Sequence, residues 1–144
     1  MEVSKPIELA RVDELKILQN VRLVKRIDLN PVKSSENLSV QFSVSGEITG
    51  NISCYLCLDG HALTSSEKNL LFPLFVESMN ILIGRQMSFD KGLSGFRFKL
   101  GAPKLSMVPR EINTRLRALT SEYTLELDHK SLTVLTEVSL TTLN

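Results

Sequence analysis

Hydrophobic and polar residues alternate along much of this chain, which is typical of strands with one buried face. The clearest alternation covers residues 38–45, where Leu, Val, Phe and Val point one way and Ser, Gln, Ser and Ser the other. Shorter or weaker alternation predicts further strands at 21–29, 52–58, 96–100, 112–119, 123–127 and 132–140. Apolar positions within residues 8–19 fit a short N-terminal helix.

One segment departs from this pattern and predicts a helix. Thr64 and Glu67 have the spacing of a capping box, and Gly84 is well placed to end the helix. Pro73 suits an early helical position, so we expect a break or kink near it. Apolar side chains gather on one side of this helix, namely Leu71, Phe75, Met79, Leu82 and Ile83.

The opposite side of the predicted helix carries the candidate chemistry. At 100° per residue, Pro73, Glu77, Asn80 and Gly84 fall within a wedge of about 60°. Glu77 is the only acidic residue of the chain that is followed three positions later by Asn. One carboxylate and one carboxamide are therefore expected side by side on the solvent face, where they can pair with a partner's cation and orient a water molecule.

Composition sets broad limits. With 144 residues, 42% of them hydrophobic and 23% charged, the chain is expected to form one domain over 1–144, of which residues 1–35 are the least defined by the pattern. No apolar run reaches the roughly 18 residues of a bilayer helix, and a cytoplasmic location is the expectation. Few aromatic residues accompany the basic ones, so we expect no nucleic-acid surface and no membrane contact. These patterns together predict an α+β fold, with an antiparallel-rich sheet and one principal motif-bearing helix packed on it.

Three glycine-containing signals follow one another along the chain: Gly46-x-x-x-Gly50, Glu77-x-x-Asn80-x-x-x-Gly84 and Gly95-x-x-x-x-Leu100-x-x-Pro103. In this order, and with a final hairpin, residues 36–141 resemble the CheC/CheX/FliY family of chemotaxis phosphatases. They are most similar to the CheX-like members, which carry a single Glu-x-x-Asn helix. The resemblance implies a CheC/CheX-like fold, homodimerisation through an exposed sheet edge, and dephosphorylation of the aspartyl phosphate of a response-regulator receiver domain.

The resemblance also implies a role for each residue of the pair. Asn80 would reach the acyl phosphate and orient the attacking water, while Glu77 would pair with a lysine of the receiver. Phosphoryl transfer depends mainly on positioning and charge stabilisation, which suits such a division. This chain would bind no cofactor, because the Mg²⁺ is expected in the partner receiver. A non-catalytic relative that only binds a receiver or a motor protein would share the same residues and remains the alternative.

Two other patterns in the sequence are those of a zinc site and of a cyclic di-GMP site. Cys54 and Cys57, with His61 and His129, nominally offer four zinc ligands, but strand positions three apart point to opposite faces, so we expect two buried, reduced cysteines. Arg22 and Arg26 match the Arg-x-x-x-Arg opening of PilZ-type modules that bind cyclic di-GMP. The Asp/Asn-x-Ser-x-x-Gly that such modules also need is incomplete in the segment that begins at Asn51.

Overall fold

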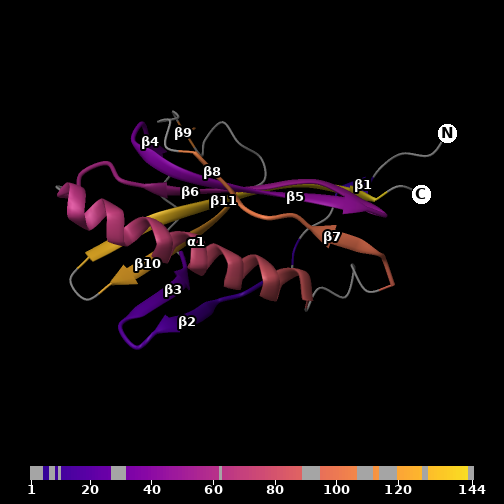
Figure 1. The fold of residues 1–144 in the computed structure, drawn as a ribbon, viewed down its shortest axis with the longest axis horizontal. Coiled ribbons are helices and arrows are strands. Elements are labelled where there is room, and N and C mark those ends of the chain that lie inside the picture. Colours follow the sequence, from indigo (N-terminus) through magenta and orange to yellow (C-terminus); the bar gives the residue numbers. More distant parts are fainter. Residues whose placement is uncertain are drawn as a thin grey trace.

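The computed structural model describes residues 5–6, 9, 11–26, 32–61, 63–88, 95–106, 112–113, 120–127 and 130–142. In the described part, one helix, α1 (Ser65–Ser88), accompanies a series of strands (Figure 1). The strands are β1 (Lys5–Pro6), β2 (Glu14–Leu18), β3 (Val21–Lys25), β4 (Lys33–Ser34), β5 (Asn37–Gly46), β6 (Ile48–Cys57), β7 (Phe98–Leu100), β8 (Lys104–Ser106), β9 (Ile112–Asn113), β10 (Thr120–Leu127) and β11 (Lys130–Thr142).

Nine of these strands form one antiparallel sheet in the order β2-β3-β10-β11-β6-β5-β7. β1 also pairs with β11, and β8 pairs with β5 on the same edge as β7. β4 and β9 form a separate two-stranded sheet. The large sheet curls, so that Figure 1 shows β5 and β6 on one side of α1 and β2 and β3 on the other.

The long central strands follow the alternation of the sequence. In β5, Leu38, Val40, Phe42 and Val44 are all buried, which confirms the clearest strand prediction. β5 and β6 form a hairpin around Glu47, and β10 and β11 pair from Leu127 and Lys130 onward, as expected for a closing hairpin. The remaining parts of two predicted strands, 27–29 and 114–119, lie outside the described residues.

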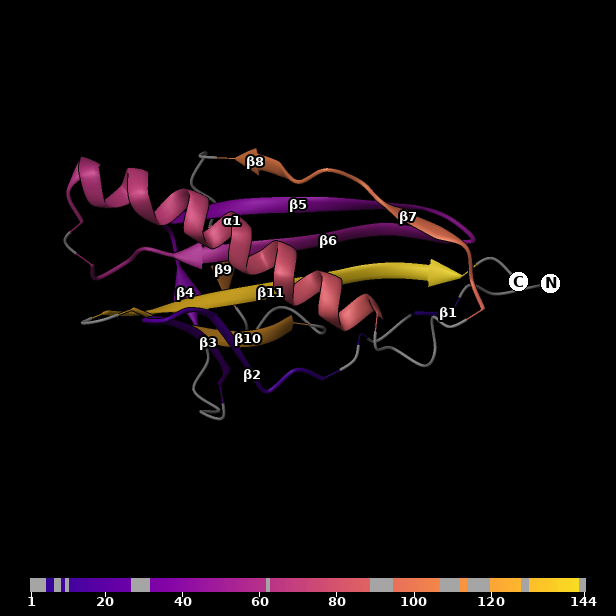
Figure 2. The ribbon, with the colours of Figure 1, turned by 60° about the horizontal axis from the view of Figure 1, so that its bottom comes forward.

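The helix crosses the concave face of the sheet, over β5, β6 and β11 (Figure 2). Its apolar side is buried as predicted, and Leu71, Phe75, Met79, Leu82 and Ile83 share one core with the inward side chains of the strands. The capping box is confirmed. The backbone N–H of Glu67 donates to Thr64 Oγ1 at 3.1 Å, and the backbone N–H of Thr64 donates to Glu67 Oε1 at 3.2 Å.

A carboxylate fixes the turn between β4 and β5. Asp59, just after β6, accepts hydrogen bonds from the Ser34 hydroxyl, from the backbone N–H and hydroxyl of Ser35, and from the backbone N–H of Glu36. Burial raises the pKa of Asp59, but these hydrogen bonds outweigh it and hold the pKa well below its ordinary value. Asp59 therefore ties the small sheet to the large one while it is ionised.

The α+β class and the CheC/CheX-like layout expected from the sequence are wrong. The described residues are mostly strand, and they form a curled antiparallel half-barrel with a single helix. One cause is the N-terminal segment, where the helix predicted within residues 8–19 is replaced by β2. There, buried Leu15 lies between exposed Glu14 and Lys16, which is a period of two rather than 3.6.

The bounds of the helix also differ from the prediction. It begins at the capping box, continues through Pro73 without a break, and passes Gly84 to end at Ser88. Proline in a helix interior removes one hydrogen bond, but Pro73 lies on the exposed side, where water can satisfy the freed carbonyl.

A single domain over 1–144 and pairing of two chains through a sheet edge stay predictions.

Candidate functional site

The exposed side of α1 carries a narrow row of residues that we call the α1 stripe: Leu70, Pro73, Glu77, Asn80 and Gly84. The first four are exposed and Gly84 is partly exposed, as the predicted wedge requires. Their positions follow from the fold, because burial of Phe75, Met79 and Leu82 against the sheet turns the other side of the helix to solvent. The structure thus brings the two candidate residues together on an open surface.

Glu77 and Asn80 lie one helical turn apart. Residues three apart on a helix have Cβ atoms about 5–6 Å from each other, so both side chains can contact one partner group. Neither side chain makes a hydrogen bond or an ion pair with another described residue. Glu77 is also the only charged residue among the exposed helix positions from Ser65 to Gly84. Its carboxylate and the Asn80 carboxamide are free to bind an incoming molecule.

Gly84 occupies an interior helical position that has room for a side chain. A Cβ built on Gly84 would meet no atom of the described part of the chain within 4 Å. Glycine in a helix interior is about 1 kcal/mol less favourable than alanine, so the fold gains nothing from this residue. The bare backbone at Gly84 leaves a flat area next to Asn80, where a partner's main chain can approach closely.

Leu70 is the residue of the α1 stripe that the predicted wedge omits. Its side chain is 77% exposed, the largest exposed fraction among the big hydrophobic residues of the described chain. The helical wheel contains the signal, because seven residues at 100° place Leu70 about 20° from Glu77. The solvent face of α1 therefore carries an exposed apolar side chain next to the candidate pair, which the predicted wedge did not include.

Comparisons with known proteins give a likeness to a solved structure and no match to a family model or a curated protein. Among solved structures, the chain is similar to a chain in the crystal structure of the CheX-CheY-BeF3-Mg²⁺ complex from Borrelia burgdorferi. The sequence identity is 14% and the TM-score 0.48, over 83% of this chain and 84% of that chain.

The two cysteines point to opposite faces of β6, as the alternation predicts. Cys54 belongs to the main core under α1, whereas Cys57 packs with Tyr55 and Leu135 in a second cluster on the other face. Burial raises the pKa of both thiols, which disfavours the thiolate that binds zinc. His129 lies outside the described residues, and within these no group of three His, Cys, Asp or Glu residues could hold a metal ion.

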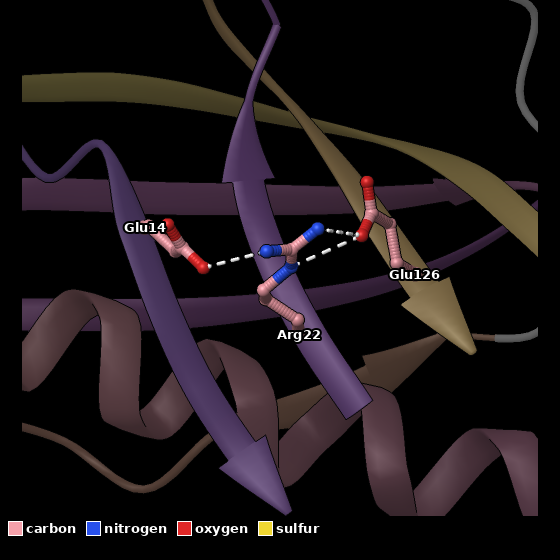
Figure 3. A network of polar contacts seen from close by, with 3 residues as sticks. All are labelled: Glu14, Arg22 and Glu126. Carbon is pink, nitrogen blue, oxygen red and sulfur yellow. Dashed lines mark hydrogen bonds and ion pairs between the residues drawn. The ribbon is translucent and has the colours of Figure 1, made fainter. Parts of the chain in front are cut away.

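The arginines of the PilZ-like pattern are held by carboxylates. Arg22 Nη2 lies 2.6 Å from Glu126 Oε2 and Arg22 Nη1 lies 2.9 Å from Glu14 Oε1, so one guanidinium links three strands (Figure 3). Hydrogen bonds to Glu126 and then to Glu14 raise the pKa of Arg22. Arg26 pairs with Glu122 at 3.0 Å. Both cations serve as cross-strand links here.

Asn51, the start of the incomplete second PilZ signal, is also distant from these arginines. It lies on β6, which is separated from β3 by β10 and β11. Strand spacing of about 4.8 Å places β6 and β3 roughly 14 Å apart, so the arrangement does not bring Asn51 together with Arg22 and Arg26. In the described ranges, no helix has the length and hydropathy to cross a bilayer.

Proposed function

We propose that the α1 stripe binds the receiver domain of a response regulator and that this chain hydrolyses the receiver's aspartyl phosphate. The observation that carries the proposal is that Glu77 and Asn80 lie next to each other on one exposed turn. Neither side chain has a partner among the described residues. The resemblance of Glu77-x-x-Asn80-x-x-x-Gly84 to the CheX-like motif gives this pair its chemical interpretation.

Asn80 is the residue that acts on the nucleophile. Its carboxamide accepts a hydrogen bond from a water molecule and directs that water at the phosphorus atom. The new phosphorus–oxygen bond forms as the bond to the aspartate oxygen breaks, and the protons of the water stay with the released phosphate. A carboxamide suits this task because, unlike a carboxylate, it does not repel the phosphate.

Glu77 is the residue that sets the register of binding. Its carboxylate pairs with a lysine beside the phosphorylated aspartate of the receiver, and the Mg²⁺ is expected in that receiver rather than in this chain. An exposed ion pair contributes little in water, but it strengthens when the interface closes over it. Glu77 makes no ion pair with a described residue, and the exposed Arg85 of the same helix lies eight residues further along, so Glu77 is available for this contact.

The decisive experiment compares Asn80→Ala with Asn69→Ala. Asn69 is an exposed asparagine on the same helix, eleven residues and about 16 Å along the axis before Asn80, so it controls for the loss of an amide away from the candidate pair. With saturating phosphorylated receiver domain and Mg²⁺, Asn80→Ala should release phosphate at least 100-fold more slowly, about 3 kcal/mol of transition-state stabilisation. Asn69→Ala should match the parent protein.

Measuring receiver binding distinguishes a phosphatase from a non-catalytic binding module, since both would use these residues. Asn80→Ala should bind the receiver almost as tightly as the parent, because Asn80 acts on the water and Glu77 on docking. If the parent protein binds the receiver but does not accelerate phosphate release, the chain is a binding module. Equal turnover by the parent and Asn80→Ala would refute the catalytic role.

A further inference from the structure

An apolar pocket of about 200 Å³ lies beside the N-terminal half of α1. Leu70, Leu71 and Leu74 of the helix form one wall, Leu127 and Leu132 of β10 and β11 form another, and Leu63 precedes the helix. Glu67 and Lys130 complete the lining and bind each other as an ion pair. The pocket is therefore almost wholly apolar, with its charged residues already neutralised.

We propose that this pocket receives one apolar side chain of the same receiver domain whose lysine pairs with Glu77. This inference rests on the proposed function. Leu70 belongs both to the pocket and to the α1 stripe, so the two surfaces are continuous. Glu77 lies seven positions after Leu70 on the helix, which is about 10.5 Å along the axis. The partner thus needs an apolar residue about 10 Å from a cation.

The size and the charges of this surface favour a single side chain as the occupant. The volume is below the roughly 300–1,000 Å³ of small-molecule pockets, but protein interfaces often place one anchor side chain in a small pocket near their centre. Glu67 is occupied by Lys130 and by the backbone of Thr64, so it offers no free charge to a ligand. The free carboxylate of Glu77 supplies the charge complementarity, which fits a basic partner surface.

The test is a titration with a CheY-type receiver domain activated by BeF₃⁻, in which hydrolysis does not interfere. Leu70→Ala removes an exposed wall of the pocket and should not affect folding, and Leu63→Trp narrows the pocket from its edge. Each should weaken binding about 10-fold or more. Leu105→Ala is the matched control, since Leu105 is a 52% exposed leucine on β8, outside the pocket. It should bind like the parent.

Glu77→Lys distinguishes failure of this inference from failure of the proposed function. If Glu77→Lys loses binding while Leu70→Ala and Leu63→Trp bind like the parent, the pocket has no such occupant and the docking role of Glu77 stands. If Leu105→Ala weakens binding as much as Leu70→Ala does, the effect is not specific and the inference is overturned. An absence of binding by the parent protein overturns both proposals together.

Discussion

Gly84→Ala should raise the stability of the free protein and weaken its binding to the proposed receiver partner. The new methyl group would meet no atom of the described residues within 4 Å, so it introduces no clash with them. Gly84 also lies inside α1, four residues before its last residue Ser88. The change therefore acts on helix propensity alone in the free protein, and on the approach of a partner in the complex.

The expected size of each effect follows from these facts. Alanine is about 1 kcal/mol more favourable than glycine in a helix interior, so the free energy of unfolding should rise by about that amount. For a chain of this length, this corresponds to a melting temperature about 3 °C higher. In the complex, the methyl group holds the partner's main chain away from the helix, and we expect about 10-fold weaker receiver binding, which is about 1.4 kcal/mol.

Two measurements on the same samples check this prediction. Chemical denaturation gives the free energy of unfolding, and titration with the BeF₃⁻-activated receiver gives the affinity. Asn69→Ala is the control, because it also raises helix propensity at an exposed position but lies about 22 Å along the helix axis from Gly84 and does not line the apolar pocket. It should raise stability by a few tenths of a kcal/mol and leave binding unchanged.

Either of two results would refute the reasoning. A loss of stability in Gly84→Ala would mean that the fold itself requires glycine at this position. A gain in stability with unchanged receiver affinity would mean that no partner approaches the bare backbone.

Three further predictions concern the fold. Gly50→Ala should lower the free energy of unfolding by about 3 kcal/mol, measured by urea denaturation, because its Cβ would lie 1.8 Å from the Ser139 carbonyl oxygen at a positive φ. The pKa of Asp59 is lower in the folded state, so its contribution is complete above about pH 4 and declines as the pH falls below that value; between pH 6 and pH 3.5 the parent should lose more stability than Asp59→Asn. Thr64→Ala should cost about 1 kcal/mol in the same assay, and an unchanged value would show that the hydrogen bonds between Thr64 and Glu67 add nothing.

Local patterns in the sequence predicted the central strands and the start of the helix, because the decisive contacts there are short-range. The alternation from Leu38 to Val44 requires only a buried and an exposed face, and the capping box requires only residues three apart. The exposed positions of Glu77 and Asn80 followed in the same way from the apolar side of the helix.

Features that depend on long-range pairing were missed. β2 was mistaken for a helix because the five apolar residues within 8–19 fit both periods, and only pairing with β3 decides between them. The fold class was missed for the same reason, since the added strands turn an α+β layout into a half-barrel. The pocket beside Leu70 joins α1 to β10 and β11, which are distant in the sequence, so no local pattern could indicate it.

The exposed side of α1 carries two residues that disfavour a helix, although the rest of the helix is well stabilised. Its start is stabilised by a complete capping box and its inner side by a continuous core, yet Pro73 and Gly84 on the outer side both disfavour a helix. Among the residues that the structure describes, no neighbour requires either of them, since Pro73 is exposed and a Cβ at Gly84 would contact none of these residues. Residues that conflict with their local structure tend to lie at functional sites. Because Glu77 and Asn80 lie between these two residues on the same stripe, all four fit the receiver-binding role that we propose for the α1 stripe.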